Sequence, residues 1–503
     1  MGFSNLDALI VVVYMLASTG VGAWIGRHQK DTLDYFLGSR QIPWYAAAFS
    51  IVATETSVLT FISIPALSYQ GNMTFLQIVF GYVLGRAIVA ALMIPAYYRG
   101  NLLTAYHFLG QRFGPLMRKI ASVTFMVTRL LADGVRLFAT AIPLALIIKG
   151  SGAFGKLTDG QFYALSILLI GSLTMVYTYV GGIRSVIWMD VVQLVIYMAG
   201  AVLAAVIILT RLPNGFASVL GWAADHHKLT WFYVGGDLSV AEFIKQPYTF
   251  FTALAGGAVV SMASHGTDQM TIQRVLACKD QRSGQKAILA SGLAVLLQFF
   301  VFLMVGVLLY AYYQGASLQQ LGLATADGIF PKFIVEELPT GISGLIVAAL
   351  FAAAMSTLSS SLSSLSSTVV LDLYVPLRGR GKSERQLLHI SRLVTLVWGG
   401  VLVVAALAFI GWKGTVVEVA LGIASYTYGG LLGGFLLGLF NSKVDQWDAI
   451  VGFVSALVVM TVVIQVAQIA WPLYIVVGSV TAVVVGTGSH KLRSAARGMS
   501  AAG

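Results

Sequence analysis

Residues 49–60 read FSIVATETSVLT, and this stretch decides how the chain must fold. It lies in the middle of an apolar segment, yet β-branched and polar side chains crowd its centre, where they weaken a helix. Unwound backbone at membrane depth is tolerated only where it lines a cavity. We therefore expect a helix that is interrupted here and that lines an internal site.

The composition places this stretch inside a membrane protein. Hydrophobic residues make up 58% of the chain and charged residues 10%, against about 45–50% and about 25% in a soluble domain. A membrane-spanning helix needs about 20 mostly apolar residues. The sequence predicts an all-α membrane protein with about 13 transmembrane helices, at 7–25, 43–69, 74–98, 120–148, 162–180, 186–210, 248–272, 287–313, 343–373, 390–411, 416–440, 448–470 and 472–489.

Basic residues predict the orientation, because Lys and Arg accumulate in cytoplasmic loops. One set of alternate loops carries Arg27, Lys30, Arg40, Arg99, Arg112, Arg118, Lys119, Arg184, Lys279, Arg282, Lys286, Arg378, Arg380, Lys382, Arg385, Lys443, Lys491, Arg493 and Arg497. The opposite set carries only Lys149, Lys156, Arg211, Lys228, Lys245, Lys332 and Lys413. We expect a multi-pass protein of an inner or plasma membrane, with its N-terminus outside and its C-terminus in the cytoplasm. The span at 7–25 has no basic flank before it, which favours a retained helix over a signal peptide.

The same loop bias explains the net charge of +11, so we expect no nucleic-acid partner. Cys278 is the only cysteine, which excludes an intramolecular disulfide and a thiolate metal cluster. The scattered histidines form no ligand spacing or catalytic triad, and we expect no enzymatic activity. No phosphate-binding Gly-rich loop precedes Lys-Ser or Lys-Thr, so the expected energy source is an ion gradient.

Ionisable side chains inside the spans require an explanation, because each one makes the free energy of membrane insertion less favourable by about 2.5–3.5 kcal/mol at the bilayer centre. They are Glu55, Arg86, Arg129, Asp133, Arg136, Asp190, Asp268 and Glu418. Charge pairs buried between helices would explain them as well as a transport site would. Both interpretations stay open on the sequence.

Residues 352–364, in the ninth span, read AAAMSTLSSSLSS. Small residues of this kind let helices pack closely. However, Ser356, Ser359, Ser360 and Ser363 also fall on one helical face, where their hydroxyls form a stripe of uncharged oxygens. Hard cations such as Na⁺ prefer oxygen ligands.

A second weak point is expected in the seventh span, at Gly256-Gly257, five spans after the first. Two interrupted helices in matching positions are typical of transporters built from inverted repeats, whose unwound carbonyls coordinate Na⁺. Spans 2–6 and 7–11 would then be the two halves.

Three motifs carry a resemblance to a known family. Residues 178–193 read TYVGGIRSVIWMDVVQ; residues 266–269 read GTDQ and are followed by Gln273-Arg274 and Lys279-Asp280; residues 352–357 read AAAMST and their span ends in LDLY at 371–374. In these motifs, and over nearly its whole length, the chain resembles the sodium:solute symporter family. Members of that family carry sugars, sialic acids, proline, monocarboxylates, vitamins or iodide.

The resemblance implies a leucine-transporter-type fold of 5+5 inverted repeats. It would comprise an extra N-terminal helix and cytoplasmic loop at 1–42, a first repeat at 43–211, an external loop at 212–247, a second repeat at 248–440, and two C-terminal helices with a basic tail at 441–503. The solute would bind near the membrane midplane.

The resemblance also implies where Na⁺ binds. The family's principal site would use carbonyls of Ala53, Thr56 and Ala353 and hydroxyls of Ser356 and Thr357. Thr357 replaces the serine usual in the family and keeps the oxygen. A second site found in some members matches Asp190, Ser356, Ser359 and Ser360, which favours two Na⁺ per solute. A helix-start capping role for Asp190 is the alternative.

Positions that resemble the family's solute contacts are Glu55, Ser57, Thr60, Gln77, Arg136, Ser261, Ser264, Ser425 and Tyr428. Sugar carriers place a lysine near Val295 and a glutamine near Leu421, which weakens a hexose interpretation. Sialic-acid carriers place an arginine near Ala132, one helical turn before Arg136.

The prediction is a secondary active transporter that couples Na⁺ to a small organic solute: a sugar, carboxylate, amino acid or vitamin. A proton-coupled symporter is the nearest alternative, because Glu55 and Asp133 could titrate. A sensor or channel on the same fold is a more distant one. The sequence does not give the oligomeric state, and a monomer suffices for the site.

Overall fold

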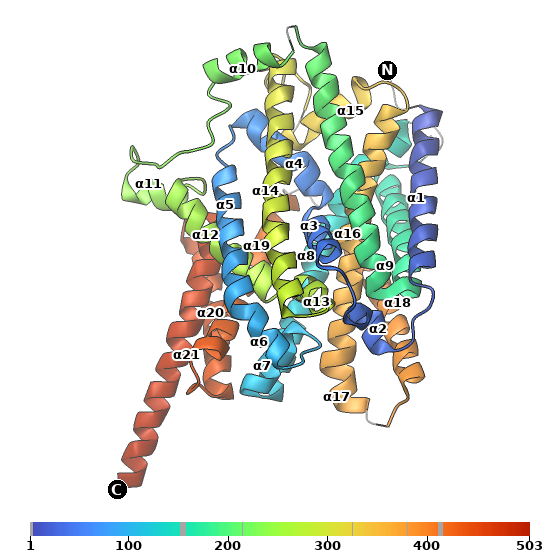
Figure 1. Ribbon diagram of the computed structural model, residues 1–503. Helices are drawn as coiled ribbons and strands as arrows, with labels where there is room; N and C mark the ends of the chain where they lie inside the picture. Colours follow the sequence, from blue (N-terminus) through green and yellow to red (C-terminus); the bar gives the residue numbers. More distant parts are fainter. Residues whose placement is uncertain are drawn as a thin grey trace.

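The computed structural model describes residues 4–150, 157–213, 215–323, 325–379, 381–410 and 416–502. Among the predicted charges, Lys156, Arg380 and Lys413 lie outside these residues, as do the side chains of Lys149 and Glu418. The described part is a bundle of long helices (Figure 1), which confirms the all-helical membrane fold class.

The first half contains α1 (Asn5–Ile25), α2 (Thr32–Leu37), α3 (Trp44–Glu55), α4 (Val58–Gln70), α5 (Leu76–Ile88), α6 (Ile94–Arg99), α7 (Ala105–Phe113), α8 (Pro115–Gly150) and α9 (Asp159–Arg211). Two short helices, α10 (Phe216–Asp225) and α11 (Val240–Lys245), lie in the long loop that follows. The second half contains α12 (Phe250–Gly266), α13 (Gln269–Leu276), α14 (Gln281–Tyr312), α15 (Ile329–Glu336), α16 (Ile342–Ser367), α17 (Val375–Arg378), α18 (Glu384–Ala408) and α19 (Val416–Phe440). Helices α20 (Gln446–Val466) and α21 (Trp471–Ala502) complete it.

Each predicted span coincides with helix in the described residues, although fewer separate helices pass a test of length and hydropathy. Nine do so in that part of the chain, and the bent pair α3–α4 makes a tenth. One reason is that α9 is long enough for two spans. Its Gly182 has φ +52°, and Gly22 of α1 packs against both Tyr177 and Met189, so the chain folds back at this glycine.

The expected interruption at Gly256-Gly257 is wrong. α12 runs through both glycines without a break, and the chain leaves the helix only at Thr267 and Asp268. The glycines serve close packing instead: a Cβ on Gly257 would lie 2.5 Å from the Ile78 carbonyl of α5. Asp268 then caps α13, its side chain accepting from the Met270 N–H at 2.8 Å. The second broken helix therefore exists, about ten residues later than predicted.

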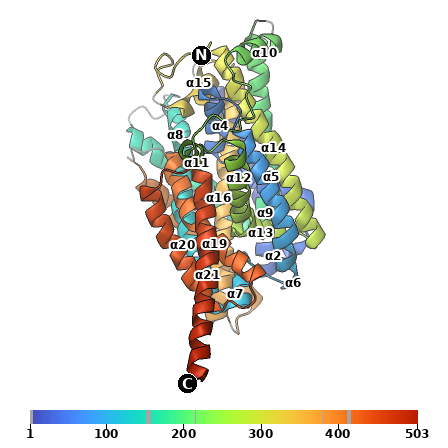
Figure 2. The same cartoon turned by 90° about the vertical axis from the view of Figure 1, so that its left-hand side faces the viewer.

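The helix α16 occupies the centre of the bundle, and its apolar window is 89% buried. It packs against α1, α8, α9 and α18. Figures 1 and 2 place the N-terminus, α10 and α15 at one end of the bundle, here called the upper end. The loops around α2, α7 and α17 and the C-terminus lie at the lower end, where α21 extends beyond the bundle.

Candidate ion and solute site

The second span is broken within the stretch that the sequence singles out, and α3 and α4 meet at a bend of 68°. Ser57 caps α4: its Oγ accepts from the Thr60 N–H, and its own N–H donates to Thr60 Oγ1, both at 3.4 Å. In a continuous helix these two N–H groups would bond to the carbonyls of Ala53 and Thr56. The break thus releases the carbonyls of Ala53 and Thr56, which were predicted as sodium ligands.

The central helix α16 brings further oxygens to this break. Thr357 Oγ1 lies 3.1 Å from the Ala353 carbonyl oxygen and 3.4 Å from the Thr56 carbonyl oxygen. Ser356 points elsewhere, because its hydroxyl donates to Asp190 at 2.6 Å. The oxygens of Thr56, Ala353 and Thr357 carry no formal charge, which suits a monovalent cation that must bind and leave again.

A charged cluster surrounds Asp190 of α9, next to a different face of α16. Its carboxylate accepts from Ser356 Oγ at 2.6 Å and from Ser50 Oγ at 2.5 Å. It also forms a salt bridge of 2.9 Å with Arg274 of α13, and both side chains of this pair are 0% exposed. Asp190 is therefore a buried ion-pair partner and not a helix-start cap.

The remaining predicted members of the second ion site are close by but differently bonded. Ser359 Oγ donates to the Ser356 carbonyl at 3.0 Å. Ser360 Oγ accepts from the Arg274 guanidinium and lies 3.0 Å from Thr54 Oγ1. Arg274 is the partner of Asp190 that sequence reasoning missed, although it stands in a quoted motif. The usable signal was Asp190 itself, because a buried acid requires a partner cation.

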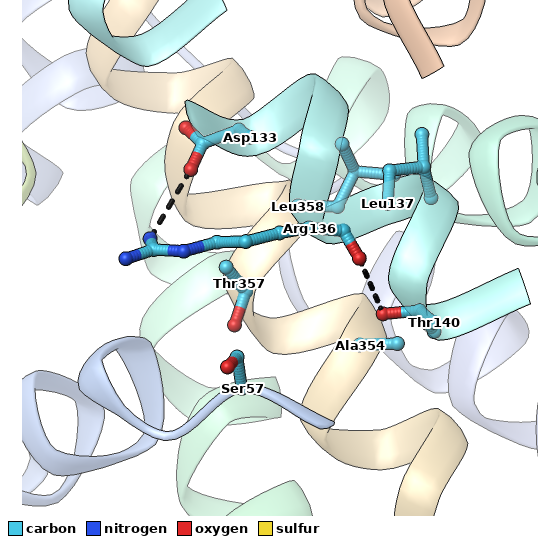
Figure 3. Close-up of a pocket in the computed structure, with 8 residues that line it drawn as sticks. All are labelled: Ser57, Asp133, Arg136, Leu137, Thr140, Ala354, Thr357 and Leu358. Atoms are coloured by element: carbon cyan, nitrogen blue, oxygen red, sulfur yellow. Dashed lines mark hydrogen bonds and ion pairs between the residues drawn. The ribbon is translucent and has the colours of Figure 1, made fainter. Parts of the chain in front are cut away.

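A small cavity adjoins the released carbonyls (Figure 3). It is lined by Ser57, Asp133, Arg136, Leu137, Thr140, Ala354, Thr357 and Leu358. Its volume is about 10 Å³, room for about one water molecule. Binding of an organic solute here therefore requires the α3–α4 link, α8 or α16 to move.

Arg136 and Ser57 are the predicted solute contacts that reach this cavity. The Arg136 side chain is 30% exposed, and its guanidinium lies 3.2 Å from Asp133 (Figure 3). Asp133 is shared, since it also lies 3.5 Å from Arg129 and accepts from Ser361 Oγ at 2.6 Å. Arg136 is thus a partly exposed cation, and its carboxylate partner, Asp133, also pairs with Arg129.

Glu55, the last residue of α3, belongs to another charged cluster. Its carboxylate forms a salt bridge with the buried Arg86 of α5 and lies 3.5 Å from Nε2 of His265. Arg86 also donates to the Ser291 carbonyl at 2.6 Å, and Ser264 Oγ lies 2.8 Å from Nδ1 of His265. The charge of Glu55 is therefore compensated inside the protein.

Two further predicted contacts bond to backbone, away from the cavity. Ser261 Oγ donates to the Tyr82 carbonyl at 2.9 Å. Gln77 donates to the Tyr248 carbonyl at 2.6 Å and accepts from the Tyr233 N–H at 3.2 Å. Gln77 therefore ties α5 to the long loop at the upper end.

The last two predicted contacts lie on α19. Tyr428 donates to Asp268 at 2.6 Å and accepts from Arg129 at 2.7 Å, and Arg129 forms a salt bridge with Asp268. Ser425, one turn earlier, is buried. Through Arg129 and Asp133, this network connects the cavity to the break between α12 and α13.

A helical membrane bundle with two broken spans, neutral oxygens at one break and a cavity beside them, defines a secondary transporter. A model of the sodium:solute symporter family matches residues 35–456, and the chain belongs to this family. It is 29% identical over 511 residues to the sodium/sialic acid symporter SiaT of Proteus mirabilis, a match that covers 99% of this chain and 97% of that one. It is also 29% identical over 451 residues to the human sodium/iodide cotransporter, over 87% of this chain and 66% of that one.

A solved structure of a Na⁺-coupled sialic acid symporter, described as substrate-bound and outward-open, is similar over 97% of this chain and 98% of that one. The TM-score is 0.84 and the sequence identity 28%. This similarity confirms the leucine-transporter-type fold. The chain is a sodium-coupled solute symporter, and it is not an enzyme.

Proposed function

We propose that the chain carries a small organic anion, specifically a carboxylate, together with Na⁺. The observation that carries the proposal is that Thr357 belongs both to the oxygen cluster at the broken helix and to the wall of the cavity that Arg136 enters. A cation and an anionic solute would therefore bind side by side and stabilise each other. The solutes in the names of two relatives, sialic acid and iodide, are anions at neutral pH.

The proposed principal Na⁺ site uses the oxygens of Ala53, Thr56, Ala353 and Thr357, whereas Ser356, the fifth predicted ligand, donates to Asp190 in this structure. The released carbonyls and the position of Thr357 support it. We also propose a second Na⁺ at Asp190. Coupling to protons has less support, because both candidate carboxylates, Glu55 and Asp133, form salt bridges with arginines.

The lower end of the bundle faces the cytoplasm in this proposal. The segments around α2, α7 and α17 and the end of α21, which lie there (Figure 1), carry many of the Lys and Arg residues of the chain. Positive residues accumulate on the cytoplasmic side of membrane proteins. The N-terminus would then lie outside.

A thermal-shift experiment tests the solute class. The purified protein is heated with carboxylates, including sialic acid and short monocarboxylates, and with neutral analogues of matched size, in NaCl and in KCl. A ligand that binds the folded state raises Tm. We expect a carboxylate to raise Tm only in NaCl. A neutral analogue that is equally effective would refute the assignment of an anionic solute.

Arg136→Gln should remove the response to the carboxylate and keep the response to Na⁺ alone. Arg211→Gln is the matched control, because Arg211 forms an exposed ion pair with Glu337 far from the cavity. If Arg136→Gln keeps the full carboxylate response, Arg136 does not bind the solute.

A further inference from the structure

The side chain of Arg274 fills a position between four elements of the transporter core. Its Nε donates to Ser50 Oγ of α3 at 2.6 Å, and Nη1 donates to the Met270 carbonyl at 2.6 Å. Nη2 donates to Asp190 of α9 at 2.9 Å and also to Ser360 Oγ of α16. A fully buried arginine with this many partners is held in one geometry.

These partners overlap the oxygens proposed for the second Na⁺. Asp190 and Ser360 belong to that set, and both bond to the guanidinium. Ser356, a third member, donates to the other carboxylate oxygen of Asp190. With Arg274 in place the acid is already neutralised, so an added Na⁺ would leave an uncompensated positive charge in a buried site, which is unfavourable. Arg274 and a second Na⁺ therefore compete for Asp190.

The competition has a mechanical consequence, because Arg274 belongs to α13, the short helix after the second break. All eight residues of α13 are buried, and it packs against α3, α14 and α16. Gln273 adds bonds to the Phe36 carbonyl at 2.9 Å and to Ser363 Oγ at 3.0 Å. The pair of Arg274 and Asp190 is the charged link that holds this helix against α9.

We propose that Arg274 is a built-in counterion that exchanges with Na⁺ at Asp190, and that this exchange releases α13 from the lower end of the core. The inference rests on the second Na⁺ of the proposed function. Arg274 is a positioning residue in this scheme, because it acts through Asp190 and α13 and touches neither the solute cavity nor the principal ion site.

The only cysteine of the chain reports on α13. Cys278 lies two residues beyond the end of the helix and is 0% exposed, and its neighbour Ala277 accepts a backbone hydrogen bond from Ile42 at 3.1 Å. Its alkylation by a maleimide measures the opening of this segment. In the unmodified protein we expect alkylation to be about tenfold faster in NaCl than in KCl. Equal rates in the two salts would overturn the proposal.

Variants separate the two ion sites. Arg274→Gln should make Cys278 react fast in both salts and add a Na⁺-specific rise in Tm, because Asp190 is then free for the ion. Asp190→Asn/Arg274→Gln, which keeps side-chain shape and removes both charges, should lose that extra rise. If the double variant responds to Na⁺ as strongly as Arg274→Gln, Asp190 does not bind the ion and the exchange is excluded.

Thr357→Ala distinguishes this inference from the proposed principal site. The Na⁺ effect on Cys278 should survive Thr357→Ala and disappear in the double variant. The opposite pattern would assign the opening of α13 to the principal site and refute the exchange. If Thr357→Ala leaves the Na⁺-dependent rise in Tm of the whole protein unchanged, the principal site fails, and the comparison of Arg274→Gln with the double variant is still valid.

Discussion

Two oxygen clusters lie on neighbouring turns of α16, and they differ in whether their buried oxygens carry a charge that needs a counterion. Around Thr357 the oxygens are neutral and come largely from backbone released by a broken helix. Around Asp190 the oxygens include a full negative charge, which Arg274 compensates. A neutral cluster tolerates the loss of its ion, whereas a buried carboxylate does not. The comparison predicts that the first cluster controls ion affinity and the second also controls stability.

The largest expected effect comes from breaking the charged cluster. Asp190→Asn should lower the free energy of unfolding by about 3–5 kcal/mol, because the buried charge of Arg274 is left without a counterion. Asp190→Asn/Arg274→Gln should recover most of this loss. Denaturant unfolding in detergent measures both variants. Similar losses in the single and the double variant would mean that the charge pair is not the cause.

In the neutral cluster, a substitution should change the affinity for Na⁺ more than the free energy of unfolding. Thr357→Ala should raise the Na⁺ concentration for half-maximal uptake by about tenfold, the equivalent of about 1.4 kcal/mol, with a smaller change in unfolding free energy. Thr357→Ser retains the hydroxyl and is the matched control. Uptake into proteoliposomes as a function of Na⁺ concentration measures both. Equal affinities in the two variants would remove the hydroxyl of Thr357 from the ion site.

The upper end of α16 tests whether a charge stabilises this helix without an ion site. Asp7 of α1 accepts from the N–H groups of Gly341 and Gly344, each at 2.7 Å. Asp7→Ala should cost about 1–2 kcal/mol of unfolding free energy, because it uncaps the helix that carries both clusters. Ser4→Ala removes a partner of Asp7 that does not touch α16, and it should cost less. The affinity for Na⁺ should change little in either variant.

The smallest effect on stability is expected at Lys228 in the long upper loop. Its charge is bound by backbone carbonyls at the end of a helix and not by a carboxylate. Its Nζ donates to the Tyr69 carbonyl at 2.7 Å and the Gly71 carbonyl at 2.8 Å, at the C-terminus of α4, and lies 3.8 Å from the centre of the Tyr310 ring. Burial lowers the pKa of Lys228 to about 8.

When the loop opens, this amine regains an ordinary pKa of about 10.4. Between about pH 8 and pH 10.4 the closed loop therefore binds fewer protons than the open one, and closure becomes more favourable as pH rises. Below about pH 8 both forms are protonated and pH has no effect. Proteolysis of the loop should slow across this window, and Lys228→Met should abolish the dependence. Lys245→Met, in the same loop, should retain it.

Much of the fold could be predicted from the sequence, because apolar length and loop charge are local properties. The break near Thr56 was predicted correctly, since polar and β-branched residues at mid-span leave few alternatives. The second break was misplaced, because Gly256-Gly257 was interpreted as a weak point of the helix. These glycines in fact admit the backbone of α5, and the helix ends at the capping residue Asp268.

The sequence by itself determined that this chain crosses a membrane many times, that a polar break lies in its second span, and that a hydroxyl stripe lies in its ninth. Each of these follows from residues close together in the chain. Only the tertiary structure decided which charges neutralise each other. Arg274 and Asp190 are 84 positions apart, and Glu55 and Arg86 are 31 apart. Such pairs depend on how helices pack, which no local pattern encodes. A site expected to hold an ion could therefore be located from the sequence, whereas the arginine that occupies it could not.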